Sequence, residues 1–219
     1  MRTKGVQREY MRNIAQTFAI SIAVLILPLI VFGQTKSVTR EEYYSAENAA
    51  ESKTDKQLRR KISIWTSYEN GRVDAITKST FEFVPPDSSR WVDVATKGAK
   101  VETIEQITIG KAVYRRENGG QWSKRTKDSD GFGFGGGEIL TGEYFIESER
   151  IGKEKLQVLR EKIANYNNTF FDEKRTWINS KGLIVKTLST TSRGQTLVSR
   201  NDVTYDYKAK PAKIVAPIK

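Results

Sequence analysis

The sequence contains no cysteine and no histidine among its 219 residues. Without cysteine the chain has no disulfide, no thiol nucleophile, no thiolate metal ligand and no cysteine that could carry a lipid. Without histidine it has no imidazole base, no histidine metal site and no histidine pH switch. Catalysis would have to rest on carboxylates, Lys, Ser or Tyr. The composition therefore favours a binding protein over an enzyme, with no catalytic residue, cofactor or metal predicted.

Long uncharged runs are also scarce, and only Phe18–Gly33 (FAISIAVLILPLIVFG) stands out. A basic segment precedes it, and this order is typical of an export signal. The run is short for a membrane helix, which needs roughly 20 apolar residues, and Pro28 would kink such a helix. The basic residues of the first segment are Arg2, Lys4, Arg8 and Arg12, against one acid, Glu9.

Val31 and Gly33 stand at positions −3 and −1 of a cleavage site before Gln34. Both residues are acceptable there, although the site is weaker than an A-x-A sequence. Cleavage would release a free protein, whereas an uncleaved segment would tether it to the inner membrane. Both alternatives place the following domain outside the cytoplasm. We therefore expect a signal peptide or N-terminal anchor over residues 1–33 and a periplasmic domain over residues 34–219.

The formal net charge is +11, and it falls to +8 when residues 1–33, with four bases and one acid, are left out. The basic residues are scattered through the expected strands. A solvated basic surface and weak attraction to an anionic membrane both fit this distribution. Export argues against nucleic acid as a partner, and we expect a monomer.

A capping box opens the one expected helix. In Thr39-Arg40-Glu41-Glu42, the Thr and the second Glu can each bond to the other's backbone N–H. Small and apolar residues then recur at helical spacing at Tyr43, Ala46, Ala49 and Ala50. This pattern predicts a helix over residues 40–54, and its thin stripe of small residues suits a wide, flat surface.

From Leu58 onward the apolar residues alternate with a period of two, as in half-buried strands. Asn70-Gly71 is a strong hairpin turn, and Pro85-Pro86 ends the strand that follows it. Short strands at close spacing predict an antiparallel sheet that curls into a barrel or half-barrel. The expected strands cover residues 58–68, 73–83, 90–97, 101–109, 112–116, 144–151, 156–163, 170–178, 183–188 and 196–207.

Residues 123–142 break the alternation, and GFGFGGG holds five of the 16 glycines. This stretch lacks the Lys-Ser/Thr pair of a phosphate-binding loop. We expect a loop, either a lid with Phe132 and Phe134 dipping into a cavity or a disordered segment. The fold class is thus mainly β (α+β), a curved antiparallel sheet of nine to eleven strands, covered by the N-terminal helix and this mid-chain loop.

Such a large sheet must close or cover its apolar face, and one helix and one loop leave room for a hydrophobic cavity. The alternative for its aromatic residues is ordinary core packing. Phe81 and Phe83 are the first candidates for the lining. The full set of candidate ligand-binding residues is Ile62, Ile64, Phe81, Phe83, Trp91, Tyr114, Trp122, Phe132 and Phe134.

Five glutamates in the strands could supply paired carboxylates for glycoside chemistry. They lie among Lys and Arg in alternating strands, so cross-strand ion pairs on a solvated face are the better interpretation. These residues are Glu102, Glu105, Glu143, Glu147 and Glu149.

The order of elements resembles the superfamily of lipoprotein carriers and lipid-binding envelope proteins named for LolA, LolB and LppX. The likeness covers roughly residues 38–219. It is carried by the export signal, REEYY, RRKISIW, FEFVPPDSSRW, ETIEQITIGKAVYRRENGGQW, RTWINSKGLIVKT and the closing VTYDYKAKPAKIVAPIK.

The resemblance implies an open half-barrel with helices over its concave face and a cavity that accepts acyl chains. This chain departs from the family in having a glycine-rich loop where the carriers have more helix, and in having no lipid-attachment cysteine. Two functions follow. The first is a non-enzymatic exported binder or carrier of lipid, acylated protein or another amphiphile, with lipoproteins as one class of partner. The second is an envelope sensor or protein-interaction module without lipid transport.

Overall fold

Most of the chain after the predicted export segment is described by a computed structural model. It covers residues 35–126, 141–165, 169–211 and 213–218. The described residues belong to one compact unit, which begins at Phe32. The predicted signal lies outside the described residues, so the boundary at residue 33 stays a prediction.

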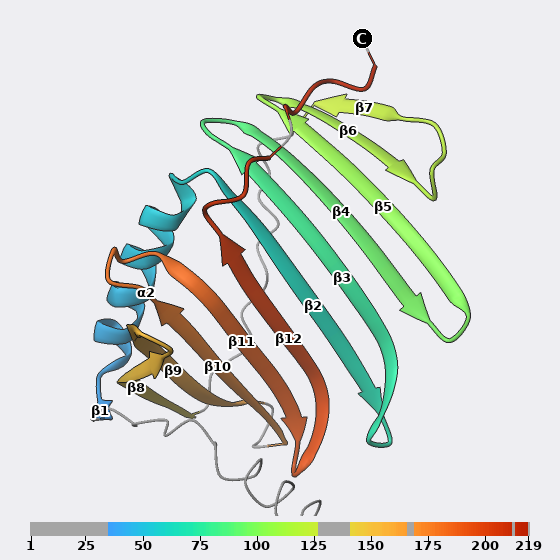
Figure 1. Cartoon of the computed structure of the whole chain (residues 1–219). Coiled ribbons are helices and arrows are strands. Elements are labelled where there is room, and N and C mark those ends of the chain that lie inside the picture. Colours follow the sequence, from blue (N-terminus) through green and yellow to red (C-terminus); the bar gives the residue numbers. More distant parts are fainter. Residues whose placement is uncertain (1–34, 127–140, 166–168, 212, 219) are drawn as a thin grey trace, which may run out of the picture. The chain divides into compact units, whose positions relative to one another are not determined.

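One antiparallel sheet dominates this unit (Figure 1). Its strands within the described residues are β1 (Lys36–Ser37), β2 (Arg59–Glu69), β3 (Arg72–Val84), β4 (Ser88–Lys97), β5 (Lys100–Ile109), β6 (Ala112–Glu117), β7 (Ser123–Thr126), β8 (Thr141–Ile151), β9 (Glu154–Asn165), β10 (Phe170–Ile178), β11 (Ile184–Arg193) and β12 (Thr196–Asp206).

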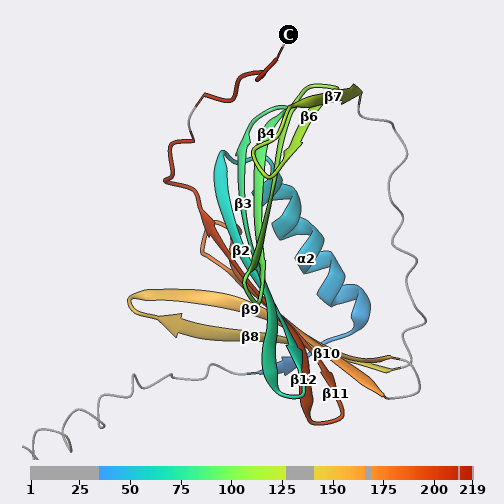
Figure 2. The same cartoon turned by 90° about the vertical axis from the view of Figure 1, so that its right-hand side faces the viewer.

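The sheet consists of two meanders joined edge to edge. Strands β2 to β7 form the first and β8 to β12 the second, and β12 pairs with β2 to join them. The edge strands β1 and β7 do not pair with each other, so the sheet is open. It bends around the side on which the helix α2 (Arg40–Asp55) lies (Figure 2). The predicted mainly β, open half-barrel is therefore confirmed.

The sheet has twelve strands in the described residues, against nine to eleven expected. The two additions are the short edge strands β1 and β7, which have two and four residues. Segments this short show no alternation of apolar residues for a pattern to detect. The expected loop over residues 123–142 was therefore too long, because β7 and the first residues of β8 belong to the sheet. Residues 127–140 lie outside the described residues.

Helix α2 begins where the capping box predicts. The Thr39 side chain accepts from the Glu42 N–H at 3.2 Å, and the Glu42 carboxylate accepts from the Thr39 N–H at 2.9 Å. The hairpin between β2 and β3 is confirmed as well. Asn70 and Gly71 have φ angles of 51° and 74°, as a two-residue turn with left-handed central residues requires.

Apolar clusters lie on both faces of the second meander. On the α2 side, Tyr43 and Ala50 of the helix pack with sheet residues. On the opposite side Trp177 packs with neighbours from β9 and β11. The first cluster is completed by Tyr144, Leu159, Ile178 and Ile184, and the second by Leu156 and Val158, with Val185 and Leu188 against it. Strands β8 to β11 are thus packed on both faces, and α2 lies on one of them.

Candidate functional site

The pairing register shows which candidate residues face the helix. Directly paired residues on antiparallel strands carry their side chains on the same face. Arg59 donates to carbonyls at the end of α2, so it marks the α2 side. Arg59 pairs with Phe83, Lys61 with Phe81, and Phe81 with Trp91. Phe81, Phe83 and Trp91 therefore lie together on the α2 side of the sheet.

The other described candidates lie elsewhere. Ile62 and Ile64 occupy the alternate positions of β2 and point to the opposite face. Tyr114 belongs to that face by its register through β5 and β4, and Trp122 lies beside Arg116 of the same face, 4.7 Å from ring centre to guanidinium carbon. The candidates thus do not share one surface, and whether any of them binds a ligand stays a prediction. Two lie outside the described residues, Phe132 and Phe134.

Two further aromatic residues complete the group on the α2 side. Trp65 has the same parity in β2 as Arg59, and Tyr205 pairs with Lys61. Sequence reasoning left both out of the candidate set, because β2 carries apolar side chains on both faces and alternation cannot say which face is covered. We call this group the aromatic face, defined as Trp65, Phe81, Phe83, Trp91 and Tyr205.

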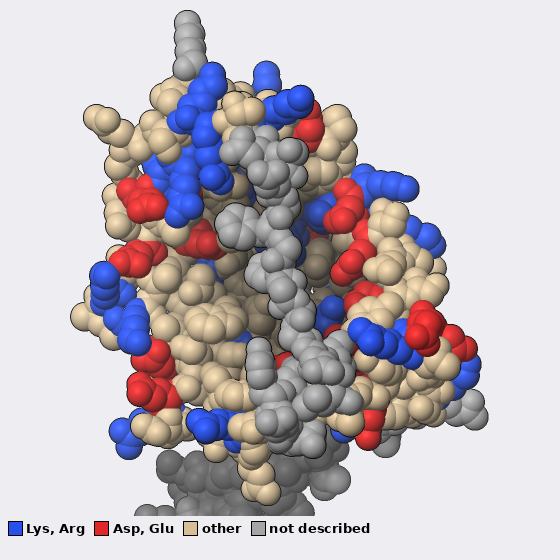
Figure 3. All heavy atoms as spheres, turned by 180° about the vertical axis from the view of Figure 1, so that it is seen from behind, with Lys and Arg blue, Asp and Glu red and all other residues tan. Residues whose placement is uncertain are grey.

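Tyr205 of the aromatic face packs against the cluster that contains Tyr43 and Ala50 of α2, whereas Trp65 and Trp91 are exposed. The helix packs mainly against β8 and β11. Trp65 and Trp91 consequently remain 41% and 42% exposed, although large aromatic side chains usually bury most of their area. Phe81 and Phe83 stack with their ring planes 7° apart. Seen from this side, uncharged surface over the first meander is bordered by charged side chains (Figure 3).

Two cationic side chains lie next to the phenylalanine rings of the aromatic face. The Arg59 guanidinium lies 4.7 Å from the centre of the Phe83 ring, and the Lys61 ammonium lies 5.7 Å from that of Phe81. Burial lowers the pKa of Lys61, and the neighbouring charge of Arg59 lowers it further. A desolvated ammonium gains from a nearby anion. The aromatic face can therefore contact an apolar chain while Lys61 meets an acidic group at its end.

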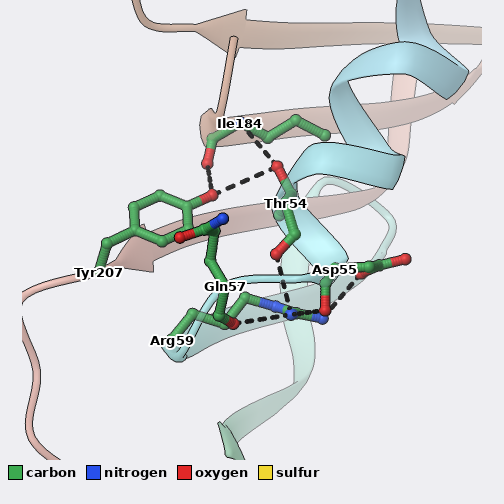
Figure 4. A network of polar contacts seen from close by, with 6 residues as sticks. All are labelled: Thr54, Asp55, Gln57, Arg59, Ile184 and Tyr207. Atoms are coloured by element: carbon green, nitrogen blue, oxygen red, sulfur yellow. Dashed lines mark hydrogen bonds and ion pairs between the residues drawn. The ribbon is translucent and has the colours of Figure 1, made fainter. Parts of the chain in front are cut away.

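A polar network attaches the end of α2 to the sheet (Figure 4). Arg59 donates to the carbonyls of Thr54, Asp55 and Gln57 and pairs with the Asp55 carboxylate at 2.8 Å. The carbonyls of Thr54 and Asp55 belong to the last turn of α2, where carbonyls have no partner within the helix, and Thr54 O also accepts from the Gln57 N–H at 3.1 Å. The Ile184 N–H donates to Thr54 Oγ1 at 3.0 Å. The network joins the helix to β2 and β11, so it sets one border of the aromatic face.

Thr54→Val tests this attachment. Valine keeps the shape of the side chain but leaves the buried Ile184 N–H without its acceptor, which costs about 1–3 kcal/mol of unfolding free energy. Urea unfolding measures the loss, and Thr54→Ser, which keeps the hydroxyl, should lose less. A valine variant as stable as the wild type would show that this hydrogen bond does not hold the helix.

Two buried carboxylates, Glu47 and Glu161, and the partly exposed Lys174 lie between α2 and the sheet. Glu47 of α2 lies 2.7 Å from the Lys174 ammonium, and the Tyr44 hydroxyl donates to Glu161 at 3.1 Å. Burial raises the pKa of Glu161, Lys174 opposes this rise, and the charge of Glu47 adds to it. Beside them Tyr43 is fully buried, and its hydroxyl has no hydrogen-bond partner among the described residues. The packing of α2 on the sheet therefore depends on the charge states of these side chains.

Three of the five strand carboxylates form ion pairs, including Glu102 with Lys100 at 2.6 Å, whereas Glu149 accepts from the Trp177 indole N–H at 2.7 Å. Glu105 pairs with Arg90 and Arg116, and Glu147 pairs with Arg160. Within the ranges that the structure describes, no three Asp or Glu gather as a metal site would require. The same ranges contain no helix of the length and apolarity needed to cross a membrane.

Comparison with known proteins finds no matching family model and no matching curated sequence. Solved structures similar to this chain include LprF from Mycobacterium bovis, at 12% identity and a TM-score of 0.44, covering 84% of this chain and all of the other. A putative outer membrane lipoprotein-sorting protein domain from Vibrio parahaemolyticus matches at 9% identity and a TM-score of 0.34, covering 80% and 96%.

A LolA superfamily protein from Nitrosomonas europaea matches at 12% identity and a TM-score of 0.30, covering 76% of this chain and 94% of the other.

Proposed function

We propose that this protein is a non-enzymatic binder or carrier of a lipid or another amphiphile, which lies against the aromatic face. The observation that carries the proposal is the pair of tryptophans, Trp65 and Trp91, left about two-fifths exposed on the side toward which the sheet bends. Two large aromatic side chains exposed on the same face as the stacked Phe81 and Phe83 rings offer an apolar ligand amphipathic contact area, as aromatic residues do at interfaces. The resemblance to envelope lipid carriers supports the same function.

Lys61 supports an amphiphile with an acidic end. Its ammonium lies next to the Phe81 ring in surroundings that lower its pKa. Burial of an acyl chain contributes about 0.8 kcal/mol of binding free energy per methylene. About ten buried methylenes therefore correspond to micromolar affinity before the entropic cost of binding is subtracted. A fatty acid or an anionic acyl lipid combines both features. Lipoproteins belong to the same class of ligand, because their acyl groups would occupy the same surface.

Export to the periplasm belongs to the proposal and rests on the basic and apolar segments before Gln34. N-terminal sequencing of the protein recovered from cells distinguishes a soluble carrier from a tethered one. A first residue of Gln34 means that the protein is free. A retained Met1 means that residues 1–33 hold it at the membrane.

The binding test compares two pairs of substitutions on opposite faces. Trp65→Gln/Trp91→Gln alters the aromatic face, and Ile64→Gln/Ile76→Gln alters the opposite face at residues of matched exposure, 41–42% in all four cases. The tryptophan double variant should bind a fluorescent fatty acid about tenfold or more weakly than the wild type, as measured in a displacement titration. The isoleucine pair should leave binding within about twofold of the wild type.

Native mass spectrometry of protein purified without detergent provides an independent measurement, with co-purified acyl lipid as the expected result. A protein that comes out empty and binds no acyl probe would overturn the proposal. If that protein also captures a stoichiometric envelope protein, the interaction module becomes the function.

A further inference from the structure

A hollow lies on the α2 side, and none of its lining residues belongs to the aromatic face. Strand β10 pairs with β9 only as far as Gln157, so the hairpin of β8 and β9 projects beyond the turn after β10. The hollow beside this projection has a volume of about 900 Å³. Four lysines from four separate elements line it, Lys36 of β1, Lys53 of α2, Lys155 of β9 and Lys181 of the turn. We call it the lysine pocket.

The charge of the lysine pocket is not neutralised by the described residues. No ion pair joins its four ammonium groups to a carboxylate of that part of the chain. The one carboxylate in the lining, Glu147, pairs with Arg160 at 3.1 Å. The other polar lining residues are the uncharged Ser148, Gln157, Asn179 and Ser180. The pocket is therefore a local excess of positive charge.

The turn after β10 makes room for one of these lysines. Gly182 has a φ of +76°, and the Lys53 ammonium lies 2.9 Å from the point that a Cβ there would occupy. A side chain at position 182 would displace Lys53, so the glycine allows the helix lysine to reach the turn that carries Lys181. Cations of distant origin in the sequence are thus gathered at one opening.

The width and exposure of the pocket indicate the kind of anion. All four lysines are exposed, and a lysine ammonium is a strongly hydrated point charge, unlike the planar arginine fork that holds a single phosphate in two bonds. An open hollow of this size with spread charges suits several phosphate groups on a surface. Lys36 also follows residues 1–33, the expected membrane-targeted segment, by only three positions, and basic groups beside such segments attract anionic lipid.

We propose that the lysine pocket docks the protein on the phosphate headgroups of an anionic membrane. The sequence led us to expect a weak attraction to anionic membranes, and this proposal attributes that attraction to the four lysines of the pocket. The proposal does not rest on acyl-chain binding, because none of its residues belongs to the aromatic face. A lysine close to an anionic surface contributes about fivefold in affinity, so four together contribute about 600-fold.

The test uses the full-length chain and vesicles of phosphatidylglycerol or phosphatidylcholine in sedimentation assays. The quantity compared is the ratio of the two partition coefficients, because any insertion of residues 1–33 is common to all variants. Lys36→Gln/Lys53→Gln/Lys155→Gln/Lys181→Gln should reduce this ratio about 600-fold. The matched control, Lys78→Gln/Lys111→Gln/Lys208→Gln/Lys210→Gln, removes the same charge from exposed positions outside the pocket and should change the ratio by less than about fivefold.

Equal losses in both quadruple variants, or no loss in the pocket variant, would overturn the proposal. Inorganic phosphate and sodium chloride at matched ionic strength separate the two sources of phosphate. Stronger displacement by inorganic phosphate would assign the pocket to a free anion and overturn membrane docking, whereas equal displacement supports it. If the pocket variant does not fold, Lys155→Gln/Lys181→Gln, confined to the hairpin and the turn, should show about a 20-fold loss.

Discussion

Tyr43→Ala should lower the free energy of unfolding by about 3–5 kcal/mol, the range measured when a large aromatic side chain is deleted from a core. Tyr43 is the centre of the interface between α2 and the sheet. Its ring is fully buried and lies 5.2 Å and 5.4 Å from the ring centres of Tyr44 and Tyr144. Alanine would leave a cavity beneath the helix, since the packed strands on the other side cannot move into it.

Tyr43→Phe is the informative control, because it keeps the ring and removes only the hydroxyl. That hydroxyl is buried without a hydrogen-bond partner among the described residues, and a buried polar group without a partner is unfavourable. The phenylalanine variant should therefore be as stable as the wild type or slightly more stable. Urea unfolding followed by tryptophan fluorescence measures both changes. A phenylalanine variant that loses as much as the alanine variant would mean that the hydroxyl has a partner in solution.

Lys174→Met should cost about 3 kcal/mol at neutral pH. Removing one partner of a buried ion pair costs 3–5 kcal/mol, and the lower end applies because the Lys174 side chain is 31% exposed. Methionine would leave Glu47 and Glu161 facing each other beneath α2 without the cation that lies between the helix and β10. The same contacts predict how this loss depends on pH.

Burial raises the pKa of Glu161 above the ordinary carboxyl value of 4.5, and Lys174 holds that rise down. A carboxyl with a raised pKa binds its proton more tightly in the folded state. Its contribution to stability is therefore present at low pH and is lost as pH rises through the raised pKa. Without Lys174 the pKa of Glu161 should rise further. The methionine variant should then lose most stability near neutral pH and recover part of it as pH falls toward 4.5.

The measurement is the difference in unfolding free energy between the methionine variant and the wild type, taken at several pH values. Taking the difference cancels the titration of all other groups. Lys78→Met on the opposite, exposed surface is the control and should show a small difference that does not change with pH. A loss in the Lys174 variant that is equally large at mildly acidic and neutral pH would show that packing of the lysine stem, and not its charge, stabilises the helix.

Local patterns in the sequence predicted the local structure well. The capping box at Thr39 and the Asn70-Gly71 turn depend only on residues a few positions apart, so their geometry follows from the backbone bonds that they make. Alternation located the long strands for the same reason. The edge strands β1 and β7 were missed because two and four residues carry too little pattern.

The candidate site was predicted only in part. Phe81, Phe83 and Trp91 lie on one face, but Ile62, Ile64 and Tyr114 lie on the other. Alternation separates the two faces of a strand without saying which one a helix will cover. Trp65 and Tyr205 joined the aromatic face only through pairing across β12, β2 and β3.

By itself, the sequence determined an antiparallel sheet, one capped helix, the absence of cysteine and histidine chemistry and an excess of positive charge. The tertiary structure alone decided that α2 packs on β8 and β11, which leaves Trp65 and Trp91 of the aromatic face exposed. It alone also gathered Lys36, Lys53, Lys155 and Lys181 at one hollow. The reason is that turns, caps and alternation arise between near neighbours, whereas cover and charge clustering depend on contacts between segments more than a hundred residues apart.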